Sequence, residues 1–504
     1  MDKRKQSHSY EYETALELTG FGKYNVGMLV CCCLLILAMF VDMFGFSVVL
    51  PSAACDLQLT TSQQGLLSAI PLIGVMVSSY TWGLCADTLG RRKTLLIAMP
   101  IGMFFNLAAS IAPTFDALAA LKFFSASFTS SANAAAFVLL GESIPRQQRS
   151  RFMFLMASAT MCSQLVISLF SLSIVGLTFR IPIHCLALEF RPWRLLMLVI
   201  CSPGILGIIS LLFLHESPKF LLSKKQDDEA MRILKSIHSC NIGSKDDFKI
   251  TTVYLEETQV NTINENTKVS FVRKMWNQTA PLFKPPLLKN SLIIYYLLLC
   301  AYMTSTGFTM WIPTMTNAYF NGKEATGKTL CEVASTAARK NNTTNHNCDN
   351  VIPPITLYSV MVYSGAAAIL NTLLSFIVKP LGKKKTTLLV FILSILFGIS
   401  LLFLRVPLLS IAFFYLFLYV SFILGNMNTY LVELNPTHLR GMATCLSVVV
   451  ARGSAFISVQ LIAELLADHC HYMFMGYVAL VISGLIVAMF LPPDTKNEKR
   501  REDE

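Results

Sequence analysis

Twelve long apolar runs recur along the chain, with shorter polar stretches between them. The runs lie at 26–50, 65–86, 94–112, 116–140, 153–177, 194–214, 291–313, 355–378, 386–404, 408–432, 442–466 and 472–491. A helix needs about 20 residues to cross about 30 Å of hydrocarbon, and each run is close to that length. The pattern therefore predicts an all-α membrane protein with twelve transmembrane helices in two sets of six.

The composition agrees with a membrane protein and argues against one that binds nucleic acid. Hydrophobic residues make up 54% of the 504 residues and charged residues only 14%, whereas soluble domains carry about 25% charged residues. The formal charge of +11 comes from basic residues in short connections between the runs. There they determine topology, so no nucleic-acid partner is expected. The first 25 residues are polar and show no cleavable signal peptide.

Lysine and arginine gather in alternate connections, and this asymmetry gives the expected orientation. These connections carry Lys3, Arg4, Lys5, Arg91, Arg92, Lys93, Arg146, Arg149, Arg151, Lys219, Lys224, Lys225, Lys383, Lys384, Lys385 and Arg440. Because such residues stay on the cytoplasmic side, both termini and the long central connection are predicted to be cytoplasmic.

The expected division of the chain has five parts. They are a tail at 1–25, a first six-helix half at 26–222, a linker at 223–289, a second six-helix half at 290–491 with an outer loop at 314–354, and a tail at 492–504. In the first tail, Glu13–Asn25 is either a short amphipathic helix that ends at Gly20 or a disordered leader. In the linker, the spacing of Asp227–Ser239 predicts a surface helix under the bundle.

The two halves repeat each other. At one constant offset, Glu142, Pro145 and Arg149 correspond to Glu433, Pro436 and Arg440. A basic turn also recurs, although Lys379 stands where the first copy has Asp87. The repeat predicts two parallel, pseudo-symmetric six-helix halves.

A tight turn joins the second and third runs. Its key residues are Gly83, Asp87, Gly90, Arg91, Arg92 and Lys93. Gly83 is expected to let two helices approach closely, and Gly90 to permit a turn that a side chain would obstruct. The stretch resembles the Gly-x-x-x-Asp-x-x-Gly-Arg-Arg-Lys signature of the major facilitator superfamily. That resemblance implies the same duplicated twelve-helix fold.

Further stretches are similar to one branch of that superfamily. Arg191–Arg194 and His215–Leu222 resemble signatures of sugar porters and organic-ion transporters, and Leu491–Lys496 resembles their terminal motif. Ala38–Asp56 looks like the first helix and exit loop of synaptic vesicle glycoprotein 2 and its invertebrate relatives. The outer loop at 51–64 is short, unlike that of organic-ion transporters, and the enlarged loop follows the seventh run, as in the vesicle proteins.

Ionisable residues inside the runs are candidate site residues, because burying them in lipid is costly. Asp42 and Lys122 lie at matching depths, and in proton-linked sugar porters an arginine in the place of Lys122 faces an aspartate of the first helix. The resemblance implies an ion pair that is either a proton-coupling site or a static pair. The glycines expected after the basic residue are replaced by Ser125–Ser127.

Arg452 lies near the middle of the eleventh run. The related organic-ion transporters carry a cavity-facing basic residue there, which implies a site for a substrate anion or for charge balance. The alternative is that Arg452 pairs with Asp42 or with a helix end. Four polar residues either line the cavity or form hydrogen bonds between helices; they are Gln164, Asn426, Asn428 and Gln460.

The charged residues at the cytoplasmic ends of the runs are expected to form a gating network that holds the inside closed. They are Asp87, Arg91, Glu142, Arg149, Glu433 and Arg440.

The outer loop offers sites for modification. Asn341 and Asn342 begin two overlapping glycosylation sequons, and Cys331 and Cys348 are placed to form a disulfide in the same loop. Gly322–Thr329 fits a phosphate-loop pattern, but it lacks the preceding buried strand that nucleotide binding requires. His469 and His471 flank Cys470, and a solvated loop is the preferred interpretation over a metal site.

The expected function is secondary transport of a small organic solute, charged or neutral, by alternating access, with a proton as a candidate coupling ion. The alternative is a protein of the same fold that no longer transports and serves as a binding or regulatory partner. No catalytic residues, metal or cofactor are expected. We expect a multi-pass monomer in the plasma membrane or a secretory or synaptic-type vesicle.

Overall fold

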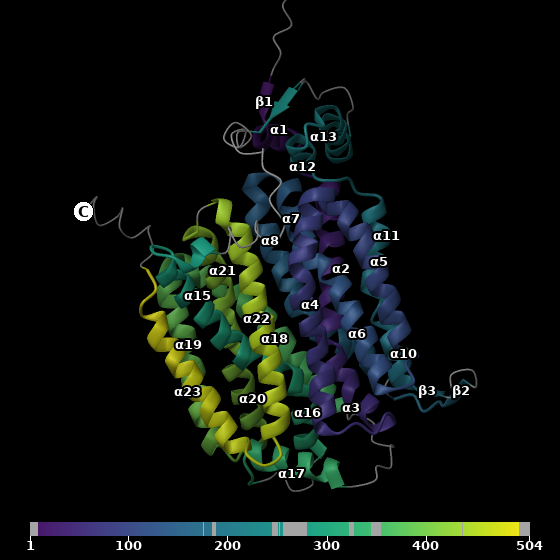
Figure 1. The fold of residues 1–504 in the computed structure, drawn as a ribbon, viewed down its shortest axis with the longest axis vertical. Coiled ribbons are helices and arrows are strands. Elements are labelled where there is room, and N and C mark those ends of the chain that lie inside the picture. The colour runs from purple at the N-terminus through teal and green to yellow at the C-terminus, as the bar shows by residue number, and fades with distance from the viewer. Residues whose placement is uncertain are drawn as a thin grey trace, which may run out of the picture.

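The structure is a computed structural model, and it describes residues 9–174, 176–183, 188–243, 250, 252–255, 280–321, 327–343, 354–435 and 437–492. It is a bundle of long helices in two halves (Figure 1). The helices of the first half are α2 (Lys23–Phe44), α3 (Phe46–Asp56), α4 (Thr61–Leu89), α5 (Arg91–Ala109), α6 (Phe115–Thr129), α7 (Ser131–Ser143), α8 (Arg146–Met161), α9 (Ser163–Ile174), α10 (Pro192–Val199) and α11 (Ser202–Leu212).

The second half repeats this arrangement with equally long helices. After the short turn η3 (Ala280–Phe283), it comprises α15 (Leu288–Ala301), the π-helical η4 (Tyr302–Thr306), α16 (Gly307–Asn321), α18 (Pro354–Leu381), α19 (Lys383–Phe403), α20 (Pro407–Leu418), η5 (Tyr419–Phe422), α21 (Ile423–Glu433), α22 (Thr437–Leu465) and α23 (Cys470–Ala488).

These helices account for twelve membrane spans. Among the described residues, ten helices are long and apolar enough to cross a membrane, and α8 with α9, bent by 43° at their junction, form an eleventh span. The twelfth is α5, which is less apolar because it begins with Arg91, Arg92 and Lys93. It packs against α6, α7 and α11 inside the bundle. The predicted twelve-helix fold with two halves is confirmed.

The halves meet through three pairs of neighbouring elements. Helix α4 runs along α22, α8 and α9 lie against α18, and α3 contacts α16. The contact between α4 and α22 is tight at Gly65, where an added Cβ atom would lie 2.6 Å from the Cβ of Ala463. At Gly83 an added Cβ atom would meet nothing within 4 Å. The expectation that Gly83 allows a close helix approach is therefore wrong, because another glycine on the same helix makes that approach.

Gly90 has the role that the sequence predicts for it. It lies between α4 and α5 with φ +109°, a backbone conformation that residues with a side chain rarely adopt. An added Cβ atom there would lie 2.5 Å from Oε2 of Glu216. The turn that begins α5 therefore needs glycine.

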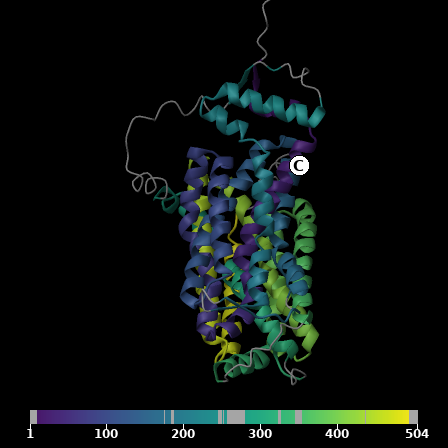
Figure 2. The ribbon, with the colours of Figure 1, turned by 90° about the vertical axis from the view of Figure 1, so that its right-hand side faces the viewer.

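The first tail and the linker pack together on one end of the bundle, which we call the inner end after its predicted orientation (Figures 1 and 2). Strand β1 (Ser9–Glu11) pairs in parallel with β4 (Thr252–Tyr254), beside α1 (Tyr12–Leu18), α12 (Pro218–Ser223) and α13 (Asp227–Ile242). We call these elements the inner cap. Helix α1 ends just before Gly20, at φ +72°, so the first tail is helical as predicted.

The predicted surface helix is α13. Three acidic residues in its first turn favour the positive end of the helix dipole, and Gly243 closes the other end at φ +85°. Its apolar face is buried at Ala230, Leu234 and Ile237, each 0% exposed. The amphipathic pattern of the linker thus covers the inner end of the first half.

The opposite end, the outer end, carries the hairpin of β2 (Ile181–Ile183) and β3 (Leu188–Phe190) and the helix α17 (Leu330–Thr343). Helix α17 lies at the outer ends of both halves, against α4, α16, α20 and α23 (Figure 1). Asn341 and Asn342 lie on its last turn, and their side chains are outside the description.

The predicted disulfide partner of Cys331 is wrong. Cys331 is bonded to Cys470, which lies 139 residues away at the start of α23. Because α17 folds back against α23, the two cysteines meet across the outer end rather than within one loop. Cys348 lies outside the described residues.

Candidate functional site

Asp42 and Lys122 form the predicted ion pair. Asp42 comes from α2 and Lys122 from α6, and the two residues are 1% and 0% exposed. The ammonium of Lys122 bonds Oδ1 of Asp42, and it also donates to the carbonyl oxygen of Asp42 at 3.0 Å and to Oδ1 of Asn106 at 3.3 Å. A buried charge is tolerable only when it is paired and hydrogen-bonded, and this pair meets both conditions.

The second oxygen of the Asp42 carboxylate is held by hydroxyl groups that the sequence analysis did not assign. Ser125 donates to Oδ2 at 2.7 Å, and Thr129 donates to the same atom at 3.2 Å. Lys122, Ser125 and Thr129 are spaced by three and four residues, so they share one face of the helical segment. That spacing is the sequence signal that could have identified them. The serine in place of an expected glycine thus becomes part of the site.

Arg452 is buried between the two halves. It lies on α22, is 6% exposed, and its guanidinium carbon lies 5.8 Å from the ring of Phe40 on α2 and 5.7 Å from the ring of Tyr302 on η4. Its Nε atom has no hydrogen-bond partner among the described residues. No ion pair joins it to Asp42 within the described part of the chain, so that alternative is wrong.

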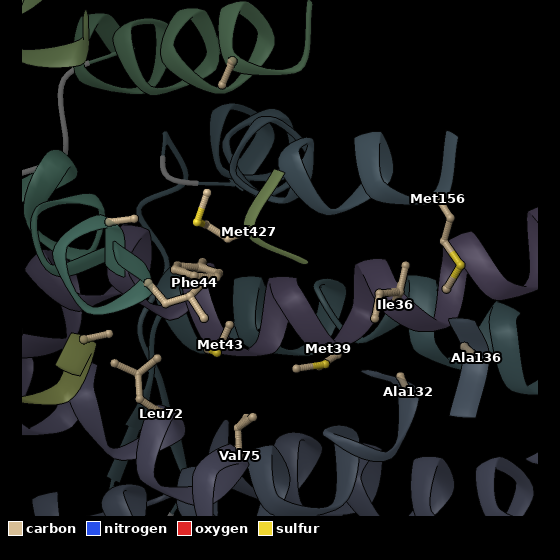
Figure 3. Packing of buried hydrophobic residues seen from close by; sticks show 14 of the residues in the cluster. Ile36, Met39, Met43, Phe44, Leu72, Val75, Ala132, Ala136, Met156 and Met427 are labelled. Atoms are coloured by element: carbon tan, nitrogen blue, oxygen red, sulfur yellow. The ribbon is translucent and has the colours of Figure 1, made fainter. Parts of the chain in front are cut away.

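An apolar layer surrounds these polar groups. Figure 3 shows Met39, Met43 and Phe44 of α2 together with Leu72 of α4 and Met427 of α21. Methionine adapts its shape to irregular surroundings. The polar groups therefore lie in a layer that contains residues of both halves and is mostly apolar.

The four uncharged polar candidates divide into two groups. Gln164 donates to the carbonyl of Thr309 on the other half at 3.3 Å, and Asn426 donates to Oγ1 of Thr387 at 3.2 Å. These two make the hydrogen bonds between helices that were the alternative prediction.

The remaining two candidates differ from that pattern. The Nε2 atom of Gln460 is buried without a partner among the described residues, near Gly65 and Trp311. Asn428 is exposed. Only Gln460 therefore resembles Arg452 in having a buried donor that the described chain does not satisfy.

The inner ends of α4, α5 and α7 carry part of the predicted gating network. Arg91 lies 3.2 Å from Glu142 and 3.3 Å from Asp87. Glu216 accepts hydrogen bonds from the backbone N–H groups of Arg92 and Lys93, at 2.9 and 3.2 Å. This carboxylate caps the start of α5, where the helix dipole favours negative charge.

Arg149 does not bond Glu142. Its guanidinium instead bonds both carboxylate oxygens of Glu13 on α1, at 2.7 and 2.9 Å. The side chains of Glu433 and Arg440 lie outside the description. Glu13 was missed because the tail gave no sign of where it would pack, whereas Glu216 stood in a motif that the sequence already displayed.

A second charged cluster lies at the outer end of the first half. Asp56 lies 3.0 Å from Arg191 and 3.6 Å from Arg194, and it accepts a hydrogen bond from the indole of Trp193 at 3.1 Å. Arg194 also donates to the carbonyls of Ser110 and Ala112, at 3.1 and 2.7 Å. The motif Arg191–Arg194 therefore joins α10 to α3 and to the end of α5.

A bundle of two six-helix halves with buried charges near their interface defines a multi-pass membrane protein of the transporter class. The chain belongs to the Major Facilitator Superfamily, whose family model matches residues 32–459.

Curated relatives place the chain beside vesicle proteins. Synaptic vesicle glycoprotein 2B of Rattus norvegicus is 26% identical over 341 residues, which are 64% of this chain and 49% of that protein. Synaptic vesicle glycoprotein 2C of Mus musculus is 29% identical over 238 residues, 47% of this chain and 32% of that protein. The chain thus spans about half the length of the 2B relative or less.

Solved structures show the same fold. A partially occluded inward-open form of the xylose transporter XylE from E. coli has a TM-score of 0.64 and 13% identity, over 93% of this chain and all of that one. A D-xylose-proton symporter structure has a TM-score of 0.62 and 15% identity, over 94% of this chain and 99% of that chain. At this identity the likeness shows the fold alone.

Proposed function

We propose that the chain moves a small organic solute across a membrane by alternating access, and that Arg452 contacts the solute. The observation that carries this proposal is the position of its guanidinium between a ring of the first half and a ring of the second. A group held between two bodies changes its surroundings when those bodies move apart. The unpaired Nε and the two rings fit a solute with an acidic or other acceptor group beside an apolar or aromatic part.

The proposed coupling ion is a proton, carried by Asp42. In this structure Lys122, Ser125 and Thr129 satisfy the carboxylate. A shift of α2 relative to α6 would separate the carboxylate from the ammonium while leaving it buried. A buried carboxylate without its counter-charge becomes neutral by taking up a proton. Proton uptake would in this way follow the movement of the helices.

The other candidate function is that of a binding or regulatory protein that has kept the fold without transport. The saturated pair of Asp42 and Lys122 favours it, because such a pair also serves as a static joint between α2 and α6. The similarity to synaptic vesicle glycoproteins fits either function. We place the protein in the plasma membrane or a vesicle, as a monomer with both termini in the cytoplasm.

Uptake by proteoliposomes separates the two functions. The purified chain is reconstituted and offered a library of organic anions, cations and sugars, with and without a pH gradient. Accumulation above protein-free vesicles supports transport, and its absence for every compound in both conditions supports the binding protein. Arg452→Lys, which keeps the charge and loses the planar fork, should raise KM for an anionic solute by about tenfold or more. Arg405→Lys, at an exposed outer position, is the matched control.

A further inference from the structure

The N-terminal segment 9–25, which we call the N-terminal strap, crosses the inner end of the first half and is attached along its whole length (Figure 2). At its start, Ser9 to Glu11 pair with Thr252 to Tyr254 of the linker. In the middle, Ala15 and Leu16 of α1 are fully buried. The strap is therefore a packed part of the inner cap.

The far end of the strap is fixed by one side chain of α13. Asn241 donates to the carbonyl of Gly20 at 3.0 Å and to Oδ1 of Asn25 at 2.8 Å, and it accepts from the backbone N–H of Tyr24 at 3.1 Å. Gly22 lies so close that an added Cβ atom would be 2.9 Å from the Asn241 carbonyl. The linker thus determines where the strap can run.

Between these attachments, the strap contacts the corner where α7 passes into α8. Tyr12 donates from its hydroxyl to the carbonyl of Glu142 at 2.6 Å. Burial raises the pKa of Tyr12 well above its ordinary value, so the hydroxyl stays a donor. Glu13 bonds Arg149, and the two side chains are 27% and 31% exposed. Neighbouring residues of the strap therefore hold both ends of the corner at Glu142 and Arg149.

We infer that Glu13 is a positioning residue of the inner gate: it keeps Arg149 on the first half and so limits closure of the inner end. Helix α8, which carries Arg149, packs against α18 of the second half. A guanidinium on that helix can turn to acceptors of the second half when the inner ends approach each other. While Glu13 occupies it, that contact is unavailable. The inference rests on the proposed alternating access.

The test measures the separation of the inner ends in the full chain, without substrate. Spin labels are attached at Cys240, exposed on α13, and at Lys289→Cys, exposed on α15, in a background without the other partly exposed cysteines. Pulsed electron paramagnetic resonance then gives the distance distribution in proteoliposomes. Glu13→Gln should enrich the short-distance population about two- to fivefold, the range expected for a partly exposed ion pair. Glu17→Gln, on the exposed face of the same helix, should leave the distribution unchanged.

The charge swap Glu13→Arg with Arg149→Glu distinguishes positioning from simple attachment of the strap. It should restore the original distribution, whereas Arg149→Glu alone should not. An unchanged distribution in Glu13→Gln, an equal effect in Glu17→Gln, or a swap that fails to restore the distances would overturn the inference. Failure of uptake with the expected distance changes would overturn only the proposed transport. A single fixed distance in every variant would overturn both.

Discussion

Ser125 donates a hydrogen bond to Asp42 across 2.7 Å, to the carboxylate oxygen that the nearby lysine does not bond. The two residues are 83 positions apart in the sequence and lie on different helices of the first half. The carboxylate is therefore satisfied on both oxygens, and the serine adds to the ion pair rather than merely replacing a glycine.

Removing the hydroxyl of Ser125 should destabilise the first half. Ser125→Ala leaves one fewer donor on a buried carboxylate, and hydrogen bonds to charged groups contribute about 1.5–3 kcal/mol. Thermal unfolding in detergent measures the loss. Ser127→Ala is the control, because its hydroxyl bonds the carbonyl of Phe123 within its own helix at 2.8 Å. Equal melting temperatures for the two variants would show that the bond to Asp42 contributes nothing.

Breaking the ion pair on one side should cost more than removing both charges. Asp42→Asn or Lys122→Met leaves a group in the core without its partner, which costs about 3–5 kcal/mol. The double variant should recover most of that loss, as a double-mutant cycle of unfolding free energies would show. If Asp42 carries the proton, Asp42→Asn should also make uptake independent of the pH gradient. Additive single losses would argue against direct coupling between the two residues.

The two glycines of the turn between α4 and α5 should respond oppositely to alanine. Gly90→Ala forces a side chain into a left-handed conformation and toward Glu216, a strain of about 1–3 kcal/mol. Gly83→Ala meets open space inside a helix and should be neutral or slightly stabilising. Expression level and melting temperature of the two variants, made in parallel, check this. A tolerated Gly90→Ala together with a damaging Gly83→Ala would reverse our assignment.

His215 should make the inner cap less stable in acid. Its ring stacks on Tyr24 and lies 3.0 Å from the hydroxyl of Ser236, and burial, with repulsion from Arg92, lowers its pKa. The folded chain therefore binds a proton at His215 more weakly than the unfolded chain. Stability is retained at higher pH and falls as the pH drops through the unfolded value of about 6.5.

The pH dependence of melting tests this expectation. Between about pH 7.5 and about pH 5.5, the melting temperature of the wild type should fall more steeply than that of His215→Gln. His471→Gln replaces an exposed histidine and should keep the wild-type slope. Parallel slopes for the wild type and His215→Gln would exclude a contribution from this ring.

The disulfide should join two distant peptides at the outer end. Digestion of the unreduced protein and mass spectrometry should recover Cys331 linked to Cys470. Cys331→Ser and Cys470→Ser should each lower stability by about 2–5 kcal/mol, and the double variant should be no worse than either single one. A peptide that links Cys331 to Cys348 would restore the pairing expected from the sequence.

The sequence by itself determined the features that depend on local composition and spacing. Long apolar runs are spans wherever they occur, a constant offset between Glu142 and Glu433 marks a duplication, and Gly90 must occupy its turn because only glycine adopts that backbone readily. Matching depths within two spans were enough to propose the pair of Asp42 and Lys122. Each of these inferences needs only the sequence and the thickness of a bilayer.

The tertiary structure decided which distant group completes each site. Glu13 meets Arg149 across 136 residues, and Cys331 meets Cys470 across 139 residues. Nothing in the sequence near these residues specifies such partners. The inner cap and α17 must first fold back onto the bundle, and the direction in which they fold is set by the burial of their apolar faces against the helix ends. Side-chain partners follow from that packing, which is why they could be found only in three dimensions.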